Sequence, residues 1–123
     1  MEDTRRKPVS DAALPPLWDR VAMLALMGND TELCAEILQL FLEDAPPMVA
    51  AIQSALAEED LATAGRVAHK LKGSLLNLAA RPVADVAHTL AHHAGPLEDA
   101  RQLGRDLAAL MARLTVQVQT ALR

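Results

Sequence analysis

One stretch of this chain carries a very regular apolar pattern. Between positions 61 and 78, apolar residues recur in steps of three and four: Leu61, Ala64, Ala68, Leu71, Leu75 and Leu78. On an α-helix these steps align the side chains in one narrow stripe, which is typical of a helix in a bundle. The pattern therefore predicts a bundle helix in the middle of the chain.

The composition supports a wholly helical chain. Hydrophobic residues make up 51% of its 123 residues, but aromatic residues only 2%. Ala and Leu dominate, and both are strong helix formers, whereas residues that favour strands are scarce. A chain of this length is expected to form a single domain with one core.

Turn-forming residues divide the chain into predicted helices. Residues 1–16 are expected to form a flexible tail, and a short helix is expected from Leu17 to Met27, before Gly28. Asn29 is the expected N-cap of a long helix that ends near Leu56, with Glu32 completing a capping box. The two prolines at positions 46–47 predict a kink in this helix rather than a full break.

The second half of the chain predicts three more helices. Asp60 is the expected cap of the regular helix described above. A shorter helix is expected over 83–94, and Gly95 followed by Pro96 predicts the start of a last helix that runs to about Leu122. Four substantial helices with short loops predict an antiparallel up-down four-helix bundle over residues 17–123, with the short first helix capping one end.

His69 is the residue most suited to chemistry. At 100° per residue it lies about 130° from the centre of the apolar stripe, so it is expected to face solvent. Its neighbours on that surface are Gly65 and Arg66 on one side and Lys72 and Gly73 on the other. Glycine inside a helix costs about 1 kcal/mol relative to alanine, so two glycines suggest clearance for another protein's approach. Leu76 is a candidate for a docking patch beside the site.

The sequence around His69 resembles a family signature. Residues 68–74 read Ala-His-Lys-Leu-Lys-Gly-Ser, followed by Asn77 and Leu78. This is similar to the Ala-His-x-Leu-Lys-Gly-Ser and Asn-Leu-Gly pattern of histidine phosphotransfer (HPt) domains of bacterial two-component phosphorelays. The segments 26–30 and 40–46 also resemble the family, so that the likeness covers about residues 17–122.

The resemblance implies a mechanism and a set of partners. His69 would accept a phosphoryl group from the aspartate of one receiver domain and pass it to another receiver. Lys72 would stabilise the phosphate, Gly73 would give the receiver clearance, and Gly65, Arg66 and Leu76 would contribute to docking. The expected partners are response-regulator receiver domains and a hybrid sensor histidine kinase. The receiver would supply Mg²⁺, and the chain would need no cofactor of its own.

Two positions depart from the family pattern. Ala79 stands where the family usually has Gly, and it would be strained by about 1 kcal/mol if the chain needs a left-handed residue there. Ala91 follows Leu90 where the family often has Glu or Gln to orient the histidine. His88 or His92 is a candidate substitute for that polar partner, and the sequence leaves the choice open.

The sequence also bears on functions other than phosphotransfer. A receiver-binding adaptor with the same fold, which accepts no phosphate, is the main alternative because of Ala91. An autonomous kinase is not supported, since there is no glycine-rich nucleotide loop. Of the histidines at 88, 92 and 93, the two at positions i and i+4 share a helix face, and two ligands without a cysteine or carboxylate are too few for a closed zinc site, so no metal site is expected. The net charge of −4 argues against nucleic-acid binding, and no membrane span is expected, so a cytoplasmic protein is predicted. A monomer is predicted because the bundle needs no partner to complete its core.

Overall fold

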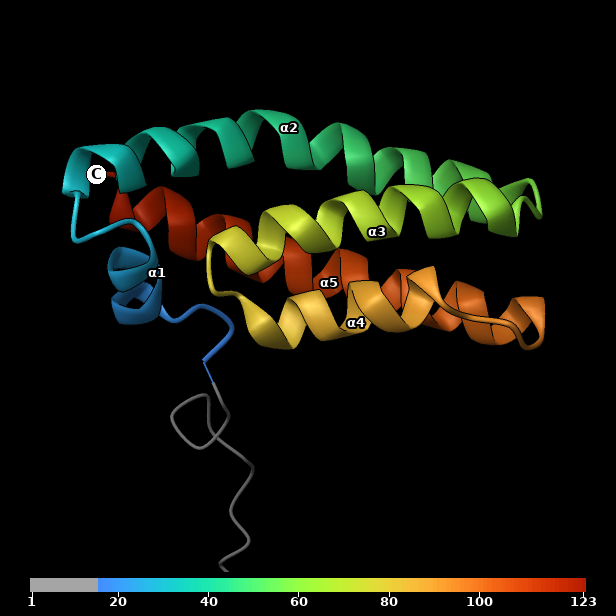
Figure 1. The fold of residues 1–123 in the computed structure, drawn as a ribbon. Helices are drawn as coiled ribbons and strands as arrows, with labels where there is room; N and C mark the ends of the chain where they lie inside the picture. The colour runs from blue at the N-terminus through green and yellow to red at the C-terminus, as the bar shows by residue number, and fades with distance from the viewer. Residues whose placement is uncertain (1–15) are drawn as a thin grey trace, which may run out of the picture.

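A computed structural model describes residues 16–123, and these residues form five helices and no strand (Figure 1). The expected tail therefore lies outside the described residues except for its last position. The helices are α1 Arg20–Leu26, α2 Thr31–Ala57, α3 Leu61–Asn77, α4 Arg81–Ala91 and α5 Leu97–Ala121. The prediction of an all-helical chain is confirmed.

Three aspartates cap the first three helices. The carboxylate of Asp19 accepts a hydrogen bond from the N–H of Ala22, and that of Asp30 accepts one from Leu33, each over 2.9 Å. Asp60 does the same for Thr63 at the start of α3, as predicted. Each cap satisfies one of the backbone donors that a helix start leaves unpaired.

The predicted capping box at Asn29 is wrong. Asp30 caps α2 instead, and Asn29 has a φ of 61°, so it belongs to the turn that ends α1. The predicted start of the first helix at Leu17 is also wrong. Asp19 delays that start to Arg20, and Leu17 precedes the helix and is buried in the core.

Three helices end in the same hydrogen-bonded turn, the Schellman motif. After α3, the N–H of Ala80 donates to the carbonyl of Leu75, and the N–H of Ala79 donates to that of Leu76. This turn places Ala79 in the left-handed region, with a φ of 62°. Gly28 and Glu59 hold the equivalent left-handed positions after α1 and α2. Ala79 therefore has the left-handed backbone in which an alanine is strained.

Prolines lie inside two of the helices without breaking either of them. Pro46 and Pro47 lie inside α2, which continues to Ala57 as one gently curved helix in Figure 1. Pro82 lies in the first turn of α4, where a missing N–H costs little. That first turn begins at Arg81, so the predicted start at Val83 and end at Ala94 both lie too far along the chain.

The four longer helices pack around one core. α3 contacts α2 and α4, and α5 contacts the same two helices on the other side, while the short α1 lies against α2 at one end of the molecule (Figure 1). The apolar stripe of α3 faces this core, because Ala64, Ala68, Leu71 and Leu75 are fully buried. The prediction of a helix from that stripe is confirmed. The opposite face of α3 lies outside the core.

Candidate functional site

His69 lies exposed on the outer surface of α3. The neighbouring Ala68 is fully buried, and so is Leu71 two residues further on. Helical geometry thus turns the imidazole away from the core that fixes its backbone. The predicted orientation of His69 is confirmed, and a rigid helix presents the ring to solvent.

The two glycines around His69 have different surroundings. At Gly73 a Cβ would meet nothing within 4 Å, so the surface there is open. At Gly65 a Cβ would lie 3.2 Å from the carbonyl oxygen of Ala91, at the end of α4. The surface is therefore open at Gly73, whereas Gly65 makes room for the close approach of α3 and α4.

Lys72 is held by a residue from the next helix. Its Nζ lies 3.2 Å from Nδ1 of His88 on α4. A charged ammonium group only donates, so His88 accepts through Nδ1 and carries its proton on Nε2. The ammonium group of Lys72 retains two further N–H donors for an anion beside His69.

His92 on α4 approaches the ring of His69. The two ring centroids lie 6.5 Å apart in an edge-to-face arrangement, with an interplanar angle of 73°. Nδ1 of His92 lies 3.0 Å from the carbonyl oxygen of His88, which can only accept, so His92 donates through Nδ1. Gly65, Arg66, His69, Ala91 and His92 line part of an open hollow of about 430 Å³ between α3 and α4.

The environment of His88 favours the neutral form of its ring. Desolvation lowers the pKa of His88 below histidine's ordinary 6.5, and the charges of His92, Lys72 and His69 act in the same direction. The carboxylate of Asp85 opposes them. The rings of His88 and His92 also lie with centroids only 4.2 Å apart, where two cations would repel each other. A neutral ring is what the hydrogen bond from Lys72 requires.

The remaining predicted site residues lie around this centre. Arg66 is exposed, and its guanidinium group donates to the hydroxyl of Thr63 over 3.3 Å. Leu76 is 38% exposed on α3, one turn beyond Lys72. The predicted residues of the site therefore share one helix, and α4 adds His88 and His92. Sequence alone named these two histidines as candidates but gave no sign that Lys72 and His88 meet.

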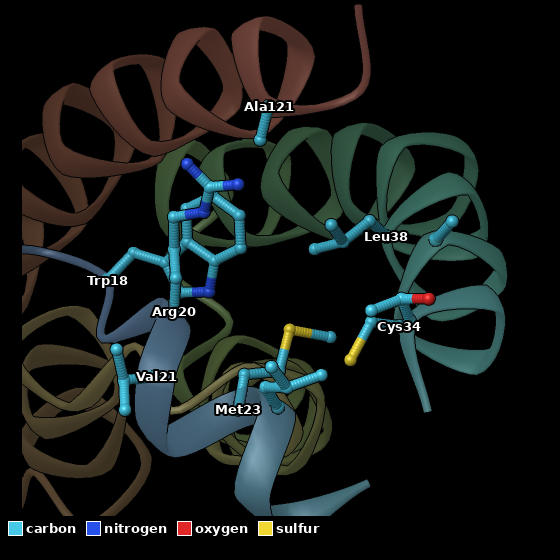
Figure 2. A pocket seen from close by; sticks show the side chains of 10 residues that line it. Trp18, Arg20, Val21, Met23, Cys34, Leu38 and Ala121 are labelled. Atoms are coloured by element: carbon cyan, nitrogen blue, oxygen red, sulfur yellow. The ribbon is translucent and has the colours of Figure 1, made fainter. Parts of the chain in front are cut away.

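A second hollow lies at the α1 end of the molecule, away from His69. It measures about 560 Å³, and Trp18, Met23, Cys34 and Leu38 line part of its wall (Figure 2). The guanidinium group of Arg20 lies 5.4 Å from the centre of the Trp18 ring. The indole N–H of Trp18 is buried without a hydrogen-bond partner. The wall is mainly apolar and holds no charged cluster suited to phosphate chemistry.

Within residues 16–123, no three His, Cys, Asp or Glu residues are grouped so that they could hold a metal ion. No helix in the described part of the chain is long and apolar enough to span a membrane.

Comparisons with known proteins identify the family. The model of the Hpt domain family matches residues 36–117, about two thirds of the chain. The comparison with curated proteins gives no match. The comparison with solved structures gives none either. The matched region includes α3 with His69, all of α4 and most of α2 and α5. The chain therefore belongs to the Hpt domain family, whose members carry out histidine phosphotransfer in phosphorelays.

Proposed function

We propose that this chain is a phosphorelay intermediate that accepts a phosphoryl group on His69 from a receiver-domain aspartate and passes it to another receiver. The observation that carries the proposal is the exposed imidazole on α3, with open space at Gly73 and a tethered ammonium group at Lys72. A nucleophile, an approach route and a counter-charge are the parts that such a transfer needs from the carrier.

The transfer follows from the chemistry of the two side chains. A free nitrogen of the neutral His69 ring attacks the phosphorus of the aspartyl phosphate. The bond from phosphorus to the aspartate oxygen breaks, the carboxylate leaves with that electron pair, and the other ring nitrogen loses its proton to solvent. Lys72 offsets part of the negative charge on the phosphoryl group. The second receiver reverses these steps with its own aspartate.

The chain's share of the reaction is limited to this carrier role. Mg²⁺ and the acidic pocket would belong to the receiver, and a hybrid sensor kinase would supply the phosphate, so the chain itself would have no kinase activity. Arg66 and Leu76 would contribute to receiver docking, since both are exposed beside the site, and Gly65 lines its hollow. The relay role would place the chain in the cytoplasm, where we expect it to act as a monomer.

The same proposal includes the finer arrangement of the fold. We infer an antiparallel up-down four-helix bundle of α2 to α5, with α1 capping one end, as a single domain over residues 17–123. Support comes from the contacts between successive long helices, from the contact that α5 makes with α2, and from the short loops between them. Such a bundle holds α3 from two sides while its outer surface stays accessible.

The test is phosphotransfer from a panel of receiver domains charged by acetyl phosphate or by a kinase. We expect acid-labile, base-stable phosphate on the wild-type chain, none on His69→Gln, and retained label on the control His93→Gln. Circular dichroism should give the same helicity for all three, because both changed side chains lie at the surface of the bundle. Label that persists on His69→Gln would refute the assignment of the site.

The adaptor function is a second candidate, and Ala91 is the observation in its favour. This position contributes only a methyl group and a carbonyl beside Gly65, so it offers no side-chain hydrogen bond to orient His69. Receivers that bind the chain but never label it would establish the adaptor.

A further inference from the structure

Two residues of α3 each meet a histidine of α4, and this pairing is not part of the family signature. At one end of the shared surface Lys72 and His88 are hydrogen-bonded over 3.2 Å. At the other end the ring of His92 meets that of His69 edge to face. The rings of His88 and His92 lie 4.2 Å apart and join the two pairs. We call these four residues the histidine–lysine cluster.

The hydrogen bond in this cluster restricts a flexible side chain. Lysine has a long stem with many rotamers, so an untethered ammonium group would sample a wide volume of solvent. His88 lies on a helix packed against α3, and its Nδ1 fixes one N–H of Lys72. The ammonium group is then held near the phosphoacceptor before a phosphoryl group arrives, which lowers the entropy lost at that step.

We propose that His88 is a positioning residue for Lys72: the neutral ring holds the ammonium group beside His69, and the protonated ring releases it. The proposal rests on the proposed function, because Lys72 acts there on the phosphoryl group of His69. His88 itself touches neither the phosphoryl group nor the receiver in this mechanism. It acts through Lys72 alone.

The sign of the pH dependence follows from the groups that face His88. From α3 these are Lys72 and His69, and from α4 they are His92 and Asp85; α5 adds none among the described residues. The folded pKa of His88 lies below 6.5, so the tether is present at neutral pH. As the pH falls through that pKa, Nδ1 gains a proton, loses its lone pair and repels Lys72. Acidification therefore breaks the tether.

The test compares rates of phosphotransfer from one phosphorylated receiver, the one that labels the wild type fastest in the panel above. At pH 8, His88→Ala should slow transfer by about two- to tenfold, the range of a typical intramolecular hydrogen bond, because exposure to solvent weakens this charged one. His88→Asn should restore most of the rate, because the Asn oxygen can accept from the same place. Thr89→Ala is the matched control on α4 and should leave the rate unchanged, since its exposed hydroxyl bonds only to the carbonyl of Asp85.

A double-mutant cycle separates tethering from a structural role. In a Lys72→Ala chain, adding His88→Ala should cause no further loss, because the acceptor has nothing left to hold. The ratio of wild-type to His88→Ala rates should also fall toward one as the pH is lowered through the pKa of His88. Equal rates at pH 8, or a full His88→Ala effect without Lys72, would overturn the proposal.

An NMR titration of His88 distinguishes this proposal from failure of the phosphorelay function itself. The ¹⁵N shifts should identify the tautomer with its proton on Nε2, and Lys72→Ala should raise the pKa of His88 because it removes a neighbouring cation. If the wild type accepts no phosphate but this signature is present, the relay function fails while the tether stands. If the signature is absent from a chain that does accept phosphate, the tether fails alone.

Discussion

The left-handed residues at the helix ends allow a quantitative test of the fold. Gly28, Glu59 and Ala79 hold the same position in three Schellman motifs, with φ values of 66°, 60° and 62°. An L-residue in this region costs about 1–2 kcal/mol, whereas glycine adopts it freely. Glycine also makes the unfolded chain more flexible, which reduces the stabilisation expected from such a change by about 0.4–1 kcal/mol.

The burial of each side chain decides the size of the net effect. Glu59 is exposed and loses no packing, so Glu59→Gly should stabilise the fold by about 1 kcal/mol. Ala79 is half-buried, and losing part of a buried methyl group costs about 0.4 kcal/mol, so Ala79→Gly should gain only about 0.5 kcal/mol. Gly28→Ala is the matched reverse change and should destabilise the fold by about 1 kcal/mol. Its Cβ would meet nothing within 4 Å, so no new packing would offset the backbone strain.

Urea unfolding followed by circular dichroism measures the free energy of unfolding of all three variants on one scale. In thermal unfolding, Glu59→Gly should raise the melting temperature by about 3–5 °C, and Gly28→Ala should lower it by a similar amount. The predicted order of stability is Glu59→Gly, Ala79→Gly, wild type, Gly28→Ala. If Glu59→Gly proved less stable than the wild type while Gly28→Ala were neutral, left-handed strain would not govern these turns.

Three further predictions concern the glycines and one helix cap. Gly73→Glu should abolish transfer from receivers through bulk and charge, while Gly73→Ala should slow the transfer only in part and stabilise the helix by about 1 kcal/mol. Phosphotransfer rates and melting curves for both variants test whether a partner needs the space at Gly73. Gly104→Ala should destabilise by about 1–3 kcal/mol despite alanine's better helix propensity, because its Cβ would collide with the buried side chain of Leu56. A variant as stable as the wild type would show that the Leu56 side chain can move aside without loss of packing. Hydrogen bonds from the side chain and backbone of Thr63 lower the pKa of Asp60 below 3.8, so the cap contributes its full stability above that pH and loses it as the pH falls through the lowered folded value. Unfolding curves from pH 6 down to about pH 2 should therefore show a loss that Asp60→Asn lacks, and parallel curves for the two chains would contradict the cap.

The sequence pattern predicted what depends on local periodicity. The stripe from Leu61 to Leu78 placed α3 correctly, and the same geometry turned His69 outward. The boundaries were less predictable where two good capping residues are adjacent. Asn29 and Asp30 are both suitable N-caps, and only the left-handed backbone at Asn29 decides between them. That backbone depends on how α1 ends, which no short pattern encodes.

Features that depend on contact between helices were not predictable in the same way. Lys72 and His88 lie 16 residues apart in the chain, and they meet only because α4 folds back along α3. The role of Gly65 was not predictable either. A glycine that leaves space for a partner and a glycine that leaves space for a neighbouring helix cannot be distinguished in the sequence. The carbonyl of Ala91 identifies Gly65 as a residue at a close helix contact.

The three helical glycines show how the molecule separates stability from function. Gly104 and Gly65 lie where another helix approaches closely, so packing accounts for both. Gly73 has no such neighbour, and alanine there would make α3 more stable by about 1 kcal/mol. Folding thus gives no reason for Gly73, whereas the proposed receiver, which would have to reach His69, gives one. The open surface at Gly73 therefore supports the proposed function independently of the family signature, and the pair Gly73→Ala and Gly73→Glu measures how close the receiver's approach would be.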